Sequence, residues 1–299
     1  MPILLPRERI GTLVGDRYRL ESIIGSGGMG AIFAGRHTWT ERPVAVKILH
    51  PEVERADAAV RRFFREAKSA ARLSHPNVVQ ILDMGETPDG VPFLVLELLE
   101  GEPLSDRVER GALDPDEALR AMLPVMDGLR RAHELGIVHR DIKPENIFLS
   151  VDGAGRAVPK LLDFGITKLL DPQDSFTTDT GVVVGTPFYM SPEQAMTPER
   201  VDGQTDVWAV GVVLYELLRG DVPFDADLPF RLLRMVVAEE PLPLAEAAPW
   251  VPAPIAAAVH VALAKAPSAR HVGMGAFMDA LLEAAKESGV EAVDPRGGG

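Results

Sequence analysis

One polar stretch, His139–Asn146, constrains this chain most, because it lies between two short apolar runs. Most of its side chains are charged or form strong hydrogen bonds, among them Asp141, Lys143 and Asn146. Apolar flanks are typical of a segment that packs on a core, whereas an ordinary surface loop has polar flanks. We therefore expect a loop that is held over a core and presents its polar groups to a ligand.

A second polar turn follows in the chain. Asp163-Phe164-Gly165 comes directly after the apolar pair Leu161-Leu162. Two neighbouring turns thus offer two carboxylates, a lysine and a carboxamide. Carboxylate and carboxamide oxygens are hard ligands for a divalent cation, and a lysine matches a phosphate. The set predicts a site for a divalent cation, a phosphate and a proton acceptor.

Composition excludes several classes of protein. The 299 residues suffice for one large domain or two lobes, and 46% hydrophobic with 25% charged residues is typical of a globular chain. A net charge of −13 argues against nucleic acid or an anionic membrane as the main partner. The absence of cysteine excludes disulfides and thiolate chemistry. No apolar run approaches the roughly 20 residues of a membrane span, so we expect a cytoplasmic chain without a membrane segment.

The first part of the chain has the pattern of strands. Residues 18–24 and 31–35 are β-type runs on either side of a glycine-rich turn at 25–30. Such a turn lets backbone N–H groups approach a phosphate, although a plain loop has the same composition more often. Lys47 lies in the apolar run 43–49 and shares a face with Ala45, so it is expected to be buried and to need a partner.

A helix predicted at residues 57–73 supplies one candidate partner. Its apolar positions, such as Phe63 and Ala67, recur with the helical period. Glu66 falls on that apolar face, where a carboxylate and a buried lysine are expected to pair. A Glu66 side chain that lies at the edge of the face and reaches solvent fits the period equally well.

Strands predicted at 78–82 and 92–97 complete five strands and one helix, after which the pattern is mainly helical. The boundary between two lobes is therefore expected at residues 97–101. The predicted organisation is an extension at 1–14, a domain at 15–288 made of a small lobe at 15–97 and a large lobe at 98–288, and a flexible tail at 289–299.

Taken in order, these features resemble the protein-kinase signature set. The set comprises Gly25-x-Gly27-x-x-Gly30, Val44-Ala45-Val46-Lys47, Glu66, the 139–146 stretch and Asp163-Phe164-Gly165. Lys143 and the 185–194 segment are similar to those of the bacterial eukaryotic-like Ser/Thr kinases. The resemblance covers about residues 15–288. It implies an α+β, two-lobed fold with a five-stranded antiparallel sheet and one helix in the small lobe and a mainly helical large lobe.

The resemblance also implies an activity, which is ATP-dependent phosphorylation of Ser and Thr hydroxyls on proteins, including the chain's own activation loop, in bacterial signalling. The implied cofactors are ATP and Mg²⁺, with Mn²⁺ as the alternative metal. The implied catalytic residues are Asp141 as proton acceptor, Lys143 and Lys47 as phosphate ligands, Glu66 as the partner of Lys47, and Asn146 and Asp163 as metal ligands. The implied nucleotide-binding residues are Ile24, Gly25, Gly27, Gly28, Gly30, Ile32, Ala45, Lys47, Leu96, Glu97 and Leu99.

Other matching residues are implied to be structural or regulatory. His139 braces its own loop, Asp206 anchors that loop, and Glu193 pairs with Arg270. Phosphate on Thr178 or Thr180 is expected to pair with Arg140 and to order the 171–190 segment, since a phosphothreonine carries close to two negative charges.

Two other functions fit the sequence less well. A pseudokinase scaffold usually lacks a phosphate-binding lysine, a proton acceptor or a metal ligand, and this chain has all of them. Small-molecule phosphotransferases of a related two-lobed fold resemble this chain less well in residues 185–194. The resemblance further suggests protein substrates, forkhead-associated domains as partners, a homodimer, and a position as the cytoplasmic domain of a longer, membrane-anchored kinase.

Overall fold

The computed structural model describes residues 4–27, 30–49, 57–163, 187–197 and 201–297. Their tertiary contacts divide them into two compact units. The first unit contains the described parts of 4–75 and residues 79–100. The second contains residues 76–78, 101–163 and the described residues from 187 onward.

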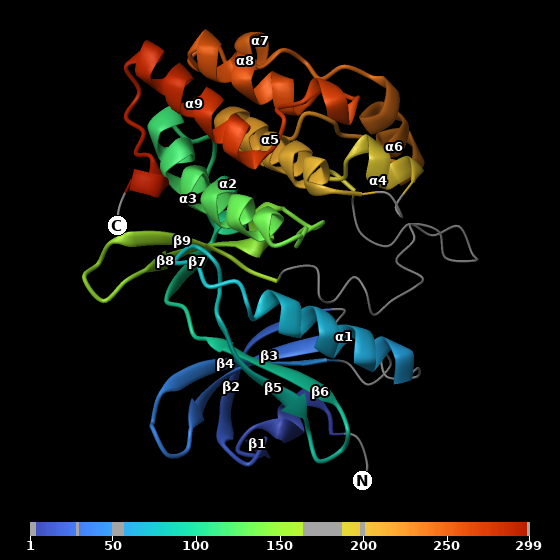
Figure 1. The fold of residues 1–299 in the computed structure, drawn as a ribbon, viewed down its shortest axis with the longest axis vertical. Helices are drawn as coiled ribbons and strands as arrows, with labels where there is room; N and C mark the ends of the chain where they lie inside the picture. The colour runs from blue at the N-terminus through green and yellow to red at the C-terminus, as the bar shows by residue number, and fades with distance from the viewer. Residues whose placement is uncertain (1–3, 28–29, 50–56, 164–186, 198–200, 298–299) are drawn as a thin grey trace. The chain divides into compact units, whose positions relative to one another are not determined.

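The first unit is an antiparallel sheet with a helix alongside it (Figure 1). The strand order is β1-β2-β3-β4-β6-β5. The strands are β1 (Leu13–Val14), β2 (Tyr18–Gly27), β3 (Gly30–His37), β4 (Pro43–Leu49), β5 (Ile81–Glu86) and β6 (Pro92–Glu97), and the helix is α1 (Asp57–Ala70). The core side of α1 buries Phe63 and Ala67 completely.

The antiparallel sheet with one helix is confirmed, with one strand more than the five expected. The additional strand is β1, in which Leu13 pairs with Arg19 and Val14 with Tyr18. Val14 is buried, and the 3₁₀ helix η1 (Pro6–Arg9) precedes it. A strand of two residues contains no alternation to detect, so the sequence pattern did not reveal it.

The strand expected at 78–82 is displaced. In the structure β5 begins at Ile81, while Val78 belongs to the second unit, where it forms a parallel bridge to Leu161. Val78 is buried by that contact. Residues of this apolar run thus belong to two different units, and they do not form one continuous strand over 78–82.

The second unit is mainly helical and is built around α5 (Gly203–Arg219), which contacts α3, α8 and α9 (Figure 1). The helix α5 is buried almost all round and ends at Gly220, whose φ is +88°. The other helices are α2 (Leu104–Val108), α3 (Pro115–Glu134), α4 (Pro192–Met196), α6 (Pro229–Ala238), α7 (Leu244–Ala247), α8 (Ala253–Ala262) and α9 (Met274–Ser288), with 3₁₀ turns η3 (Pro144–Asn146), η5 (Pro267–Ala269) and η6 (Pro295–Gly297).

A small sheet accompanies these helices. It has the order β7-β8-β9, formed by β7 (Gly101–Pro103), β8 (Ile147–Val151) and β9 (Ala157–Leu161). The polar stretch 139–146 leads into β8, and Asp163 comes two residues after β9 ends. Across the described ranges, no helix combines the length and apolar character that a membrane crossing requires.

Candidate functional site

In the second unit, the polar stretch forms a loop in which Asp141 and Asn146 are held together. The Asn146 Nδ2 group donates to the backbone carbonyl of Asp141 at 2.7 Å and to its Oδ2 at 3.0 Å. Lys143 Nζ lies 3.6 Å from the same Oδ2. Pro144 starts the 3₁₀ turn that brings Asn146 back toward Asp141, and the backbone N–H of Asn146 donates to the Lys143 carbonyl at 3.0 Å. The loop therefore presents a carboxylate, an ammonium and a carboxamide from one short turn.

Asp206, in the first turn of α5, anchors this loop by accepting hydrogen bonds from its backbone. Its Oδ2 accepts the backbone N–H of His139 at 2.9 Å, and its Oδ1 accepts that of Arg140 at 2.8 Å. His133 Nε2 lies 2.8 Å from Oδ2. Burial alone would raise the pKa of Asp206, but its hydrogen bonds to His133 and to the His139 backbone outweigh burial and keep that pKa below its ordinary value. The anchoring role expected for Asp206 is confirmed.

His139 links the two polar turns. Its side chain is fully buried, and burial lowers its pKa, which favours the neutral ring. The ring Nε2 lies 2.8 Å from the Leu162 carbonyl, and Nδ1 accepts the Asp141 backbone N–H at 3.3 Å. A neutral imidazole has one donor and one acceptor, which matches these contacts. The expected bracing role of His139 is confirmed, and the brace reaches the residue before Asp163.

Two residues of this region have backbone conformations that L-residues rarely adopt. Arg140 has a φ of +67° and Asp163 a φ of +43°. The strained peptide at Arg140 is fixed on both sides, because Asp206 accepts its N–H and Gln194 Nε2 donates to its carbonyl at 3.0 Å. Strain that the surroundings hold in place is typical of functional sites. Gln194 did not appear among the predicted site residues, although the Ser191-x-x-Gln194 capping box marks it in the sequence.

The donor set of this loop fits a magnesium ion. The amide nitrogen of Asn146 is used by Asp141, which leaves its carboxamide oxygen as the atom that could bind a metal. That oxygen and the Asp163 carboxylate are hard ligands. Within the described ranges, no three His, Cys, Asp or Glu side chains form a metal-binding cluster. A metal held by few protein oxygens takes its remaining ligands from water and phosphate, which is how Mg²⁺ is usually bound.

In the first unit, the glycine-rich turn joins β2 to β3, with Gly27 opposite Gly30 in the register. Gly30 has a φ of +156°, and a Cβ at this position would lie 2.2 Å from the Ile48 carbonyl oxygen. The close approach of β3 to β4 therefore requires glycine at Gly30. A Cβ at Gly27 would meet nothing within 4 Å. Gly28 lies outside the described residues.

Four of the predicted nucleotide-binding side chains, Ile32, Ala45, Lys47 and Leu96, share one face of the sheet. Lys47 pairs with Ile32 on β3, and Ala45 pairs with Leu96 on β6. Residues two apart on a strand, and residues opposite each other across strands, point to the same side. Lys47 is only 7% exposed, so the expected burial of its side chain is confirmed. Its role toward phosphate stays a prediction.

Glu66 lies on α1 between Phe63 and Ala67, both of which are completely buried. Its side chain is 31% exposed and forms an ion pair with Arg65, whose Nη2 lies 3.2 Å from Glu66 Oε1. The structure thus records Arg65 as a partner of Glu66. The pair between Glu66 and Lys47 stays a prediction.

The remaining predicted positions are distributed as follows. Ile24 lies on β2 and is 52% exposed, Gly25 pairs with Ile32, and Leu99 is half-buried after β6. Glu97 ends β6, where its backbone N–H and its side chain both bond to Gln80. Thr178 and Thr180 lie outside the described residues.

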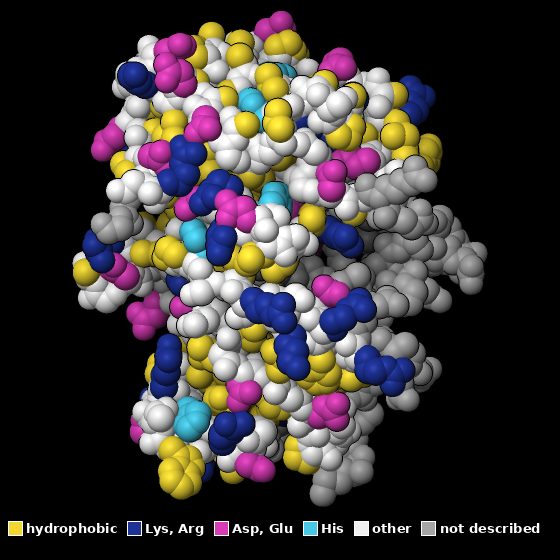
Figure 2. All heavy atoms as spheres, viewed as in Figure 1, with side chains coloured by type: hydrophobic (Ala, Val, Ile, Leu, Met, Phe, Trp, Pro, Cys, Tyr) yellow, Lys and Arg dark blue, Asp and Glu magenta, His cyan; other side chains and the backbone are white. Residues whose placement is uncertain are grey.

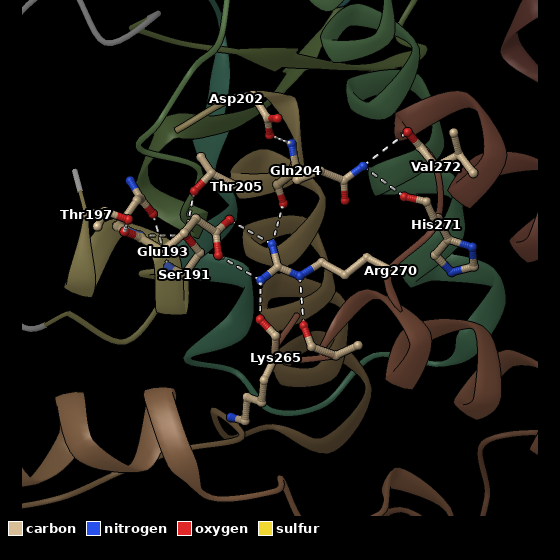
Figure 3. A network of polar contacts seen from close by, with 12 residues as sticks. Ser191, Glu193, Thr197, Asp202, Gln204, Thr205, Lys265, Arg270, His271 and Val272 are labelled. Carbon is tan, nitrogen blue, oxygen red and sulfur yellow. Dashed lines mark hydrogen bonds and ion pairs between the residues drawn. The ribbon is translucent and has the colours of Figure 1, made fainter. Parts of the chain in front are cut away.

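A buried ion pair joins Glu193 on α4 to Arg270 (Figure 3). The two guanidinium nitrogens of Arg270 contact the two carboxylate oxygens of Glu193 at 2.8 Å each. Arg270 also donates to the carbonyls of Ala264 and Gln204, at 2.8 and 2.9 Å. Burial alone would raise the pKa of Glu193, but Arg270 outweighs burial and lowers it. The expected ion pair is confirmed, and it fixes the segment that contains Gln194.

Comparison with known proteins agrees with this arrangement. The sequence profile of the family described as "Protein kinase domain" matches residues 18–247. A solved structure of the PknI kinase domain of Mycobacterium tuberculosis superimposes with a TM-score of 0.72 at 27% identity, over 92% of this chain and 98% of that one. The chain belongs to the protein kinase family.

Curated relatives are bacterial serine/threonine-protein kinases. A probable serine/threonine-protein kinase of Corynebacterium efficiens is 41% identical over 267 residues, which is 87% of this chain and 40% of the relative. Serine/threonine-protein kinase Pkn1 of Myxococcus xanthus is 41% identical over 284 residues, with 92% and 40% covered. PknB of Mycobacterium tuberculosis is 38% identical over 271 residues, with 89% and 39% covered. The chain thus spans about two fifths of the length of these relatives.

Proposed function

We propose that this chain transfers the γ-phosphoryl group of ATP to Ser and Thr hydroxyls of proteins, as a Ser/Thr protein kinase of bacterial signalling. One observation carries the proposal. The Asp141 carboxylate is held in a fixed orientation by Asn146 and Lys143, in a loop that Asp206 anchors. A pseudokinase scaffold does not use an oriented proton acceptor, so this arrangement argues against that alternative.

The proposed chemistry places each residue of the loop in one role. Asp141 orients the attacking hydroxyl and accepts its proton as the new oxygen–phosphorus bond forms, while the bond between the γ-phosphorus and the β–γ bridging oxygen breaks and ADP leaves. Lys143, whose ammonium lies next to Asp141, neutralises charge on the transferring phosphoryl group. Asn146 and Asp163 would hold Mg²⁺, which would supply further neutralisation of phosphate charge; Mn²⁺ is the alternative metal.

The first unit is proposed to hold the nucleotide. Lys47 binds the α- and β-phosphates with Glu66 as its partner, and the backbone of the glycine-rich turn covers them. Ile24, Ile32, Ala45 and Leu96 enclose the adenine ring, while the backbone of Glu97 and Leu99 hydrogen-bonds it. The proposed catalytic domain is 15–288, with lobes at 15–97 and 98–288.

Regulation and partners are proposed on sequence grounds. Autophosphorylation of Thr178 or Thr180 would give Arg140 an anionic partner, and the same phosphothreonines would suit a forkhead-associated domain. A homodimer and a cytoplasmic site of action complete the proposal.

The test is transfer itself. The purified chain is incubated with Mg²⁺ and γ-labelled ATP, alone and with a Ser/Thr-rich acceptor protein, and phosphosites are mapped by mass spectrometry. We expect label on Ser and Thr, including Thr178 or Thr180, and none with Asp141→Asn or Lys47→Met. Asp116→Asn, which removes an exposed carboxylate on α3, serves as the matched control and should retain full labelling. Label that persists undiminished in Asp141→Asn would contradict the proposal.

A further inference from the structure

One face of α1 and the turn after it carries a row of basic side chains. Arg61, Arg65, Lys68 and Arg72 follow one another at intervals of four, three and four residues, which is the spacing of a single helix face. All four are exposed, and Figure 2 shows dark blue side chains gathered over α1. We call these four residues the basic row.

The basic row is unusual for this chain. The chain has a net charge of −13, yet the row concentrates four positive charges on one short surface. The helix dipole favours cations near a helix C-terminus, which suits Lys68 and Arg72 but disfavours Arg61 in the first half of α1. Like charges four residues apart also repel. The row is therefore unfavourable for α1 by itself, and a bound anion would relieve the repulsion.

Arg65 connects the basic row to the predicted partner of Lys47. Its Nε and Nη2 donate to Glu66 Oε1 at 3.3 and 3.2 Å. Adjacent residues do not face each other on a helix, so Arg65 reaches sideways to make this pair. The two side chains are 73% and 31% exposed, and exposed ion pairs contribute little to stability. In the part of the chain that the structure describes, no acidic partner is recorded for the other three members.

We propose that the basic row docks a phosphorylated segment of a partner protein, and that docking transfers Arg65 from Glu66 to the phosphate. Three of the four residues are arginines, whose planar forks match phosphate oxygens better than a lysine does. Glu66 then loses its competing partner and is available to Lys47. The regulatory part rests on the proposed kinase function, whereas docking itself does not.

A peptide fits the row better than a membrane or a nucleic acid. The four residues span about three helical turns, roughly 16 Å, which a short extended segment can follow. An extended anionic surface would also face the rest of this acidic chain, and the net charge of −13 would repel it. A short phosphorylated segment would contact mainly the basic row and would therefore largely avoid this repulsion.

Docking is tested by fluorescence anisotropy on the full chain. The probes are a labelled peptide that carries two phosphothreonines and its unphosphorylated counterpart. We expect the phosphopeptide to bind, and the double variant Lys68→Glu/Arg72→Glu to weaken that binding at least about tenfold, since each reversal removes a charge-assisted contact. Arg19→Glu, an exposed arginine of the same unit outside the row, should change the affinity less than twofold.

Three results would overturn docking: no binding by the parent chain, equal binding of the unphosphorylated peptide, or unchanged binding by the double variant. Anionic vesicles that bind the parent but not the double variant, with no peptide binding, would point to a membrane instead and would also overturn it.

The coupling to Glu66 is tested by the rate of phosphoryl transfer. We expect the phosphopeptide to raise kcat of the parent several-fold and to leave the double variant unaffected. Arg65→Gln should raise the basal kcat and reduce the response to peptide. An active chain whose kcat ignores bound peptide would overturn the coupling. A chain that binds the peptide but phosphorylates nothing would contradict the proposed function while supporting docking.

Discussion

Asp206 on α5 accepts the backbone N–H of Arg140 at 2.8 Å, and Arg140 has a φ of +67°. A carboxylate that is completely buried thus holds the strained residue next to Asp141. The proton acceptor of the proposed reaction is therefore positioned from a rigid helix. The geometry of the loop should depend on Asp206 as much as on the loop's own residues.

Replacement of this anchor should cost both stability and activity. In Asp206→Asn one carboxylate acceptor becomes an amide donor, which cannot accept both the His139 and the Arg140 N–H groups. We expect a loss of about 3 kcal/mol in the free energy of unfolding, since hydrogen bonds to a buried charge are involved. Urea denaturation measures this loss, and the rate of phosphoryl transfer should fall at least about tenfold.

Asp202→Asn is the matched control on the same helix. Asp202 is the N-cap of α5, where its side chain accepts the Gln204 N–H at 2.9 Å, and asparagine caps helices about as well as aspartate. The substitution Asp202→Asn should therefore shift the free energy of unfolding by less than about 0.5 kcal/mol. Equal effects of the two substitutions would show that Asp206 has no special anchoring role.

Because Arg270 and Glu193 form a buried ion pair, replacement of Arg270 by lysine should lower the free energy of unfolding. Arg270→Lys keeps the charge but loses the two-pronged contact and leaves the carbonyls of Ala264 and Gln204 without their donor. We expect a loss of about 3 kcal/mol, measured by thermal or urea denaturation. Arg234→Lys alters an exposed pair, with side chains 78% and 44% exposed, and should cost less than about 0.5 kcal/mol. A small effect at Arg270 would contradict this role.

The contact between the N-terminal segment and the β5–β6 turn should depend on pH. Burial alone would raise the pKa of Asp89, but hydrogen bonds from Arg9 and Thr87 outweigh it and lower that pKa from 3.8 to about 2. A lowered carboxyl pKa stabilises the fold above the unfolded value and loses this contribution as pH falls toward 2. The contribution should be about 2 kcal/mol above pH 5 and about half of that at pH 3.

Urea denaturation of the parent and of Asp89→Asn checks this window. The difference between their unfolding free energies should be largest near pH 6 and should shrink by pH 3. A difference that stays constant across this range would rule out the pair as its source.

Much of the site was predictable because its signals are local or spaced in a fixed order. The strand alternation around Lys47 correctly indicated a buried lysine. A lysine is expensive to bury without a partner, so its presence in an apolar run was informative. The pair between Glu193 and Arg270 and the anchoring role of Asp206 were implied by the resemblance to the protein kinases, and the structure contains both.

Other features depend on tertiary contacts that the chain order does not show. Arg9 and Asp89 are 80 residues apart, and no local pattern connects them. His133 contacts Asp206 from α3, where its spacing resembles that of any helix residue. Asp114 and Glu117 have the spacing of a helix capping box, yet Asp114 makes no side-chain cap bond and Glu117 pairs with Arg107 at 2.8 Å. The contact with Arg107 takes the place of the local one.

The central claim is that Asp141 accepts the proton during phosphoryl transfer, and one comparison tests it most directly. The turnover of an acceptor protein and the affinity for ATP are measured side by side for the parent and Asp141→Asn. We predict a fall in kcat of about 10²–10⁴-fold, with an ATP affinity within twofold of the parent, because the substitution leaves the nucleotide-binding residues intact. Unchanged turnover in Asp141→Asn would contradict the account.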